Sequence, residues 1–394
     1  MFNVIDEGIK NPEKYLKSES ISKSDVQNWI EYVIKKIDQN LSIFTHKFPS
    51  PASKNLIYEP VENKDWTASF FTGMLWLAYE MTGDEKYKKI AEIHIDSFRE
   101  RFEKSIRIDT HDLGFLYSLS CVSAYKLTKN DFAKELAIKA AEHLSKRYYP
   151  NAKIIQAWGK MDDNEQKGRI IIDCLMNLPL LYWTSEEKKD RVFFEIAYSH
   201  ATKTAENIVR SDASTYHTFY FDTETGKPLY GKTHQGYSDD SCWSRGQAWG
   251  IYGFTLSYLY SKDESFLELA KRLANYFLNR LPEDYIPYWD LIFTSGDEPR
   301  DSSAAAIALC GLLELVRILP LTDSYREFYE NAAKNIVYSL SNNYISNSTN
   351  SNGILLHAVY SKPGGNGVDE HCIWGDYFYF EALVRLYKSW QMYW

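Results

Sequence analysis

The sequence predicts an all-α fold, an (α/α)6 barrel of six inner and six outer helices that forms a single domain over residues 1–394. Two observations predict it. Six strongly apolar segments share one plan, a polar or aromatic tip followed by a helix rich in small residues, and amphipathic segments alternate with them. Strand patterns are sparse, since only residues 216–221 and 353–360 look extended. No low-complexity linker divides the chain.

The apolar segments are expected to form the inner ring, because a helix that is apolar on every side must be buried. They begin near Trp66, Asp112, Asp173, Asp240, Asp301 and Gly375. The longest apolar run, 304–316, contains a glycine and a glutamate and is too short to cross a membrane.

The outer ring is expected from charged segments with apolar residues at i, i+3, i+4 and i+7, the pattern of a helix with one buried face. Examples are residues 85–104, 130–147, 189–210 and 325–341. An open helical solenoid is the alternative arrangement. The matched size of the six repeats, with polar tips at one end, favours a closed ring.

The amino-acid composition limits the classes of function that the protein can have. The net charge of −8 argues against a nucleic-acid partner, which usually requires a basic face. The 30 Tyr, 20 Phe and 11 Trp residues suit a protein that stacks rings on sugars. No signal peptide or membrane span is evident, so a cytoplasmic protein without a membrane partner is expected. The five scattered cysteines are typical of reduced thiols. No pattern sets an oligomeric state.

Four of the expected inner helices begin at an aspartate, a residue type that commonly caps helices. Capping suffices to explain Asp301 and Asp240. Asp173 fits that explanation poorly, because three isoleucines precede it and place it in an apolar setting. Burial and a second carboxylate, Asp112, would raise the pKa of Asp173 so that it acts as a general acid. Paired acids at a barrel mouth are typical of glycoside hydrolysis.

Residues 216–249 gather further polar and aromatic side chains around glycines, as expected of a ligand-binding loop. Arginine offers a planar fork for a carboxylate, and tryptophan offers a stacking face. The members are His217, His234, Gln235, Trp243, Arg245 and Trp249. Metal-binding and phosphate-binding motifs are missing from the sequence, so neither a metal nor another cofactor is expected.

These residues carry a resemblance to the unsaturated glucuronyl hydrolases of glycoside hydrolase family 88. The similar segments span nearly the whole chain. They include Trp66, HDLGF with Asp112, Trp158, RIIID with Asp173, His217, GKTHQGYSDDSCWSRGQAWGIYG and the terminal GVDE–IWGDYFYFEAL. The resemblance implies an (α/α)6 barrel and an intracellular enzyme without metal or cofactor. The substrates it implies are oligosaccharides that end in a 4,5-unsaturated uronic acid, produced by lyases from glycosaminoglycans.

The resemblance also implies residue roles. Asp112 and Asp173 correspond to the catalytic pair; Asp173 would protonate C4 and help to deliver water to C5, hydrating a vinyl ether. Asp112 would hold sugar hydroxyls and tune its partner. Substrate contacts are implied for Trp66, Trp158, His217, Gln235, Arg245 and Trp249, and for Gly231 and Thr233 on the far side of the scissile bond.

One loop departs from the family pattern. Members that favour sulfated substrates carry Ser-x-x-Ser-x-Lys near the C-terminus, whereas this chain has Ser361-Lys-Pro-Gly-Gly-Asn366. Ser361 is kept and remains a candidate substrate contact, while a glycine and an asparagine replace the second serine and the lysine. Glycosaminoglycan disaccharides are therefore expected as substrates, with the preference for sulfate left open.

Other functions fit parts of the pattern. An unsaturated rhamnogalacturonyl hydrolase would use the same chemistry on pectin fragments. An inverting glycosidase would cleave saturated sugars, and a sugar epimerase would isomerise without cleavage. A non-catalytic sugar-binding protein would bind equally well with Asp173 replaced by Asn.

Overall fold

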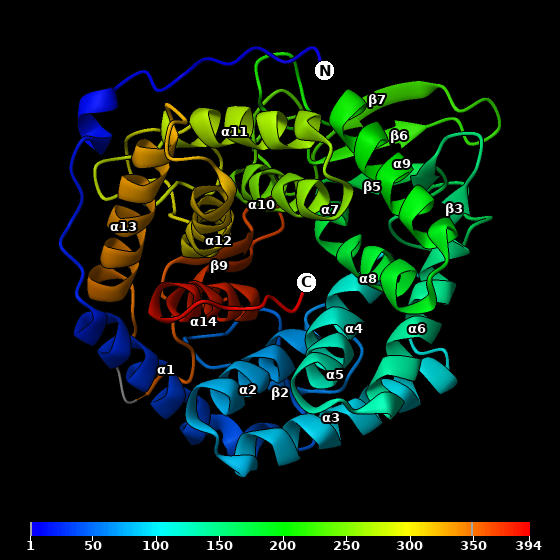
Figure 1. The fold of residues 1–394 in the computed structure, drawn as a ribbon, viewed down its shortest axis with the longest axis horizontal. Helices are drawn as coiled ribbons and strands as arrows, with labels where there is room; N and C mark the ends of the chain where they lie inside the picture. Colours follow the sequence, from blue (N-terminus) through cyan, green and yellow to red (C-terminus); the bar gives the residue numbers. More distant parts are fainter. Residues whose placement is uncertain (1, 348–349) are drawn as a thin grey trace.

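The computed structural model describes residues 2–347 and 350–394, and Figure 1 shows its helices in two layers around a common centre. The inner helices are α2 (Ala68–Thr82), α4 (Leu113–Tyr117) with its continuation α5 (Ser123–Thr128), α7 (Cys174–Asn177), α8 (Pro179–Lys188), α10 (Ser244–Ser261), α12 (Ser302–Ile318) and α14 (Ile373–Tyr387). The outer helices are α1 (Lys23–Phe44), α3 (Glu85–Glu103), α6 (Asp131–Ser145), α9 (Arg191–Asn207), α11 (Glu264–Leu278) and α13 (Arg326–Asn343). A π-helical turn, η2 (Ser118–Val122), joins α4 to α5, and η1 (Pro12–Tyr15) precedes α1.

The inner layer closes on itself. Each inner helix packs against the next in chain order, and α14 packs against both α12 and α2. The helix α10 is buried from Ser244 to Ser257, as predicted for an apolar inner helix. The outer helix α11 buries one face and begins at a capping aspartate, Asp263. The mainly helical fold predicted from the two kinds of segment is therefore confirmed.

Side-chain caps are common in the outer layer, where α13 lacks one, and rare in the inner layer. Ser22, Asp84, Asn130, Asp190 and Asp263 cap the outer helices α1, α3, α6, α9 and α11. Within the described residues, α12 is the only inner helix with a side-chain cap, from Asp301. The other inner helices begin without one, so their polar tips keep side chains for contacts at the mouth of the ring.

Short strands join the helices at that mouth. Antiparallel pairs form between β1 (Phe48–Pro49) and β2 (Pro60–Val61), β3 (Tyr148–Tyr149) and β4 (Ile154–Ile155), and β8 (Ala358–Ser361) and β9 (Asn366–Glu370). The strands β5 (Arg169–Ile171), β6 (Thr218–Phe221) and β7 (Pro228–Lys232) form one sheet. Each of the two segments expected to be extended contains a strand, β6 in 216–221 and most of β8 in 353–360. The expectation that strands are confined to these segments was wrong, because strands of two to five residues are too short to show alternation. Only parts of 216–221 and 353–360 are strands.

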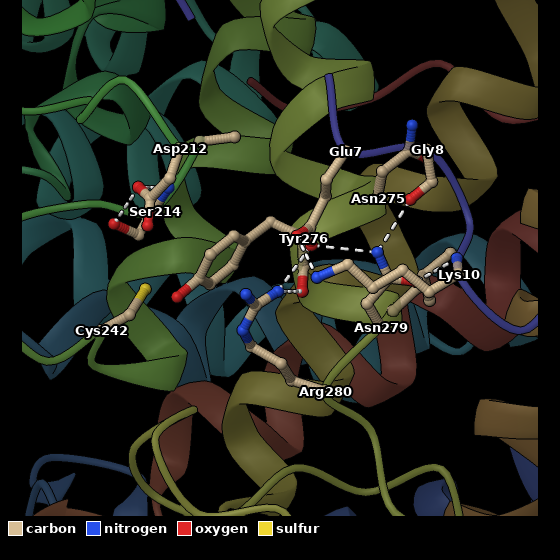
Figure 2. Close-up of polar contacts among 12 residues, drawn as sticks. Glu7, Gly8, Lys10, Asp212, Ser214, Cys242, Asn275, Tyr276, Asn279 and Arg280 are labelled. Carbon is tan, nitrogen blue, oxygen red and sulfur yellow. Dashed lines mark hydrogen bonds and ion pairs between the residues drawn. The ribbon is translucent and has the colours of Figure 1, made fainter. Parts of the chain in front are cut away.

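The N-terminal segment runs outside the ring (Figure 1), and Figure 2 shows its polar contacts with the end of α11 and the two residues that follow it. Asn279 donates to the Glu7 carboxylate at 2.9 Å and to the Gly8 carbonyl at 2.8 Å. Arg280 forms an ion pair with Glu7 at 2.6 Å, and its guanidinium lies over the Tyr276 ring. These bonds fix the segment that leads to α1.

The other end of the chain fills the centre of the ring (Figure 1). The buried Trp394 ring stacks on Phe378 with centroids 5.8 Å apart, and its indole N–H donates to Glu381 at 2.8 Å. All five cysteines are free and buried, as expected of reduced thiols. In the part of the chain that the structure describes, each helix is too short or too polar to cross a membrane.

Candidate active site

Two neighbouring inner-helix tips bring Asp112 and Asp173 together. Each aspartate occupies the N-cap position of its helix, α4 and α7, yet neither side chain bonds to a backbone N–H of that helix. Asp173 therefore stands at the cap position without capping the helix, so capping does not explain it, as the sequence indicated. Its carboxylate is turned toward Asp112, which leaves it available for chemistry.

Close packing of the two tips depends on a glycine. A Cβ atom at Gly114 would lie 2.2 Å from the Asn177 Cα, so any larger residue would push α4 away from α7. The Asn177 side chain then joins the helices, because its Oδ1 accepts from the Phe115 N–H at 2.8 Å. Pro179 follows and starts α8 in a position that needs no N–H donor.

Asp112 is buried and held by two donors. Its Oδ2 accepts from the Thr110 hydroxyl at 2.7 Å and from the Trp158 indole N–H at 3.1 Å. Burial raises the pKa of Asp112 to about 6, while these two hydrogen bonds and nearby arginines oppose the rise. Both donors favour the charged form, so Asp112 is the member of the pair that ionises first.

Within the part of the chain that the structure describes, Asp173 has no side-chain donors like those that hold Asp112. Its side chain is 14% exposed, and its Oδ1 has no hydrogen-bond partner among the described residues. Burial and then the charge of Asp112 raise the pKa of Asp173 well above its usual value, against the opposing charges of Arg245 and Arg169. A raised pKa lets a carboxyl group hold its proton to higher pH, which suits the general-acid role expected of Asp173; that role stays a prediction.

His111 lies between the two acids. Its Nε2 is 3.4 Å from Oδ1 of Asp112 and 3.4 Å from Oδ1 of Asp173, and neither ring nitrogen has a hydrogen-bond partner within the described chain. Burial lowers the pKa of His111 to about 3, so the ring is neutral. The three ligand atoms lie within 4.8 Å of one another, a spacing that a divalent ion could bridge. The expectation of a metal-free enzyme stays a prediction.

Arg245 anchors a second group of side chains. Its guanidinium donates to Oδ2 of Asp301 at 3.2 Å, to Oε1 of Gln235 at 2.6 Å and to the carbonyls of Val359 and Tyr360. The same group lies between the rings of two tryptophans, 4.4 Å from Trp243 and 4.8 Å from Trp374. Asp301 caps α12 as predicted, and it also fixes Arg245, a role that the sequence did not indicate.

His217 faces the loop that follows β7. Its Nδ1 accepts from the backbone N–H groups of His234 at 2.9 Å and Gln235 at 3.2 Å. Burial lowers the pKa of His217 well below its usual value. With Nδ1 engaged as an acceptor, the proton of the neutral ring sits on Nε2, where it can donate a hydrogen bond to a ligand.

The predicted glycine and threonine contacts lie in this same segment. A Cβ atom at Gly231 would come within 2.4 Å of the Tyr216 ring, so packing already requires glycine there. Thr233 is engaged locally: its hydroxyl accepts from the Gly236 N–H at 2.8 Å, and its own N–H donates to Asp239 at 2.7 Å. Their contacts with substrate stay predictions.

Aromatic side chains line the space between the two groups. Trp66 stacks on Trp374 with centroids 5.2 Å apart and donates its indole N–H to the Tyr360 hydroxyl at 3.2 Å. Trp158 is 39% exposed, while Trp249 is 1% exposed and packs on Phe115 and Phe378 beneath the site.

The loop after β8 continues from this aromatic lining. Ser361 follows Tyr360, whose carbonyl accepts from Arg245, so the loop begins beside the second group of side chains. The Ser361 hydroxyl accepts from the Gly364 N–H at 3.4 Å.

Asp240 does not have the position that the sequence predicted for it. It is exposed, and the N-cap position of α10 belongs to Trp243, three residues later. The loop before α10 is held instead by Asp290, which accepts from the Tyr237 N–H at 2.9 Å and from the Ser241 hydroxyl at 2.7 Å. Capping by Asp240 was therefore a wrong expectation.

Several functional neighbours escaped the sequence analysis. Thr110 and His111 directly precede Asp112, and this adjacency was the available signal. Tyr360 and Trp374 carry no local pattern that separates a pocket wall from a core residue. Arg169 begins the RIIID segment, yet its environment becomes evident only from the fold.

Comparison with known proteins agrees with this geometry. Residues 33–379 match the profile of Glycosyl Hydrolase Family 88. The chain is 47% identical to an unsaturated chondroitin disaccharide hydrolase of Streptococcus pneumoniae over 390 residues, which is 98% of each chain.

The chain belongs to glycosyl hydrolase family 88.

Solved structures support the same relationship. The fold matches the crystal structure of an unsaturated glucuronyl hydrolase from Streptococcus agalactiae with a TM-score of 0.97, 47% identity and 99% coverage of both chains. It also matches a variant of that enzyme complexed with dGlcA-GalNAc6S, with a TM-score of 0.90, 45% identity and 99% coverage of both chains. The predicted family is thus confirmed.

Proposed function

We propose that this protein is an unsaturated glucuronyl hydrolase. It removes the non-reducing 4,5-unsaturated uronic acid from di- and oligosaccharides that lyases generate from glycosaminoglycans. The observation that carries the proposal is the close, buried pair Asp112 and Asp173, in which burial raises the pKa of each acid and the charge of Asp112 raises that of Asp173 further. Membership of family 88, and relatives that bear this activity in their names, support it.

Asp173 is the general acid and base. Its proton goes to C4 of the C4=C5 double bond, and the resulting cation at C5 is stabilised by the ring oxygen. The Asp173 carboxylate then takes a proton from water as the water oxygen bonds to C5. The C5 hemiketal opens to a ketone, C1 becomes a hemiacetal, and its collapse to an aldehyde releases the second sugar.

Asp112 sets the protonation state of its partner. Its charge, held by Thr110 and Trp158, discourages ionisation of Asp173 until the proton is delivered to carbon. Asp112 keeps Oδ1 free of these two donors, so this oxygen can accept from a sugar hydroxyl. The His111 ring beside both acids is neutral, so it adds no positive charge that would favour ionisation of Asp173.

The remaining predicted contacts position the sugar. Nε2 of His217 and the amide of Gln235 suit hydroxyl or carboxylate oxygens, and Arg245 adds positive charge behind Gln235. Trp66 and Trp158 offer rings on which a sugar can stack. We interpret the two layers of helices as an (α/α)6 barrel with these residues at one end.

The C-terminal loop that begins at Ser361 affects the preference for sulfated substrates. The Ser361 hydroxyl is partly engaged by the Gly364 N–H, and Lys362 follows it directly rather than lying several residues along the loop. We expect unsulfated and sulfated chondroitin disaccharides both to be cleaved, with less preference for sulfate than in relatives that carry the serine and lysine pattern.

The test is ultraviolet absorbance of unsaturated chondroitin disaccharides during incubation with the purified protein. Loss of the conjugated enol-acid band, together with release of the amino sugar, is expected. Pectin-derived unsaturated disaccharide and a saturated disaccharide serve as comparison substrates. Turnover of only the pectin fragment would move the assignment to a rhamnogalacturonyl hydrolase. Turnover of only the saturated sugar, or binding without turnover, would overturn the proposed chemistry.

A further inference from the structure

One face of the β5–β6–β7 sheet carries a row of side chains that leads away from the catalytic pair. Arg169 pairs with Tyr220, and Tyr220 pairs with Tyr230, so the three side chains lie on the same face of three adjacent strands. The Tyr220 and Tyr230 rings stack with centroids 4.9 Å apart. The next residue on β5, Ile170, and its partner on β6, Phe219, point to the other face of the sheet and are buried in the core.

The row begins at the active site. The Arg169 guanidinium lies over the Trp158 ring, 4.9 Å from its centroid, and the Trp158 indole donates to Asp112. Two further strand spacings, roughly 10 Å in all, carry the row to Tyr230, which is 55% exposed. The Tyr220 hydroxyl lies 3.4 Å from Nε2 of His234 at the edge of the pocket.

The Arg169 guanidinium makes no hydrogen bond or ion pair with a described residue, although its charge acts on Asp173 and opposes the rise in the pKa of that acid. The Arg169 side chain is 6% exposed, and no carboxylate or carbonyl among the described residues accepts a hydrogen bond from it. Its Nε is sealed from solvent, whereas the two terminal nitrogens keep accessible surface. The terminal nitrogens of Arg169 therefore keep hydrogen-bonding capacity that an anionic ligand can use.

A second cation lies on the same face. Lys232 pairs with Thr218, two residues beyond Tyr230 on β7, and it is exposed with no ion pair within the described chain. Arg169 and Lys232 thus place two positive charges beside a row of aromatic rings. Arg245 differs from both, because Asp301, Gln235 and two carbonyls already engage it.

We propose that Trp158, Arg169, Tyr220, Tyr230 and Lys232 form a binding surface for the sugars beyond the scissile bond of an acidic oligosaccharide longer than a disaccharide. The aromatic rings stack on those sugars, and the two cations bind their carboxylate or sulfate oxygens. The inference rests on the proposed function, since it extends the same site along the reducing side of the substrate.

The experiment compares kcat/KM for an unsaturated chondroitin disaccharide with that for the unsulfated tetrasaccharide, whose additional anion is the carboxylate of the second uronate. The wild type is expected to favour the tetrasaccharide. Tyr230→Thr, which keeps strand propensity, Lys232→Gln and Arg169→Gln are each expected to lower the tetrasaccharide-to-disaccharide ratio. For Arg169→Gln the loss should reach about ten-fold, as a charge-assisted hydrogen bond implies.

Matched controls come from the outer helices. Tyr338→Thr on α13 and Lys139→Gln on α6 remove an exposed tyrosine and an exposed lysine far along the chain from this face, and they should leave the ratio unchanged. A 6-sulfated disaccharide tests whether the cations bind sulfate as well as the carboxylate of the second uronate. Sensitivity of that substrate to Arg169→Gln, beyond the effect on unsulfated disaccharide, would assign sulfate binding to Arg169.

The outcomes distinguish this inference from the proposed function. Turnover of the disaccharide with a ratio that none of the three variants changes would overturn the extended surface and leave the activity standing. Absence of turnover with both substrates would overturn the activity and the inference with it. Calorimetric titration of Asp173→Asn with both saccharides gives the same comparison as binding constants, and equal affinities would contradict the inference.

Discussion

Replacing Asp112 by Asn tests the electrostatic design of the pair. The substitution keeps the shape and an oxygen that can accept from Thr110 and Trp158, and it removes the buried charge. In the folded protein the pKa of Asp112 is raised from 3.8 to about 6. Ionising this group above pH 6 therefore costs the folded state roughly 3 kcal/mol relative to the unfolded chain.

The direction in which stability changes with pH follows from the protons bound by the folded and unfolded states. Between about pH 4 and pH 6 the folded wild type holds a proton on Asp112 that the unfolded chain has lost, so wild-type stability falls as pH rises. Asn carries no such penalty. Asp112→Asn should match the wild type near pH 4 and exceed it at pH 8, and relief of the repulsion on Asp173 acts in the same direction.

Thermal unfolding measured from pH 4 to pH 8 checks the difference. For 394 residues, 3 kcal/mol corresponds to a rise in Tm of about 4 °C at the alkaline end. Asp240→Asn is the matched control, because that aspartate is exposed and its substitution should give no trend with pH. A variant that is less stable than the wild type at pH 8, or a difference that does not grow with pH, would refute the reasoning.

Further predictions concern the groups that support the pair. Arg245→Lys keeps the charge but loses the fork that reaches Asp301, Gln235 and two carbonyls, so a loss of about 3 kcal/mol in the free energy of unfolding is expected, measured by denaturant titration. Equal stability would contradict that network. Gly114→Ala places a Cβ against the Asn177 backbone and should lower kcat and destabilise the protein by about 1–3 kcal/mol; unchanged kcat would show that the spacing of α4 and α7 is unimportant. Dialysis against a chelator should leave kcat/KM unchanged, because the pair transfers protons itself, and loss restored by a divalent ion would assign a metal to His111, Asp112 and Asp173.

The helical architecture could be predicted because its signals are long. Segments such as 304–316, apolar on every side, can only be buried, and the prediction of α12 followed directly. The short strands could not be predicted in this way. The strand β7 contains a proline and a glycine, and its pairing with β6 becomes evident only in three dimensions.

The candidate site was predictable to a similar degree. Asp173 drew attention because an acid follows three isoleucines, and Asp112 followed as the acid of the preceding inner helix. His111 and Arg169 were missed for a physical reason. Their significance lies in unmet hydrogen-bonding capacity, which depends on neighbours distant in sequence. Asp240 illustrates the opposite error, since its residue type suits a cap but the helix begins later.

The central claim is that the reaction begins with proton transfer from Asp173 to C4 of the double bond. The most direct measurement is proton NMR of the product formed in heavy water, sampled early and compared with product incubated without enzyme. Proton transfer from Asp173 should place one deuterium at C4 in a single configuration with the wild type, and Asp173→Asn should form no such product. A product that keeps the C4 vinyl proton while the second sugar is released would show direct glycosidic cleavage and contradict the account.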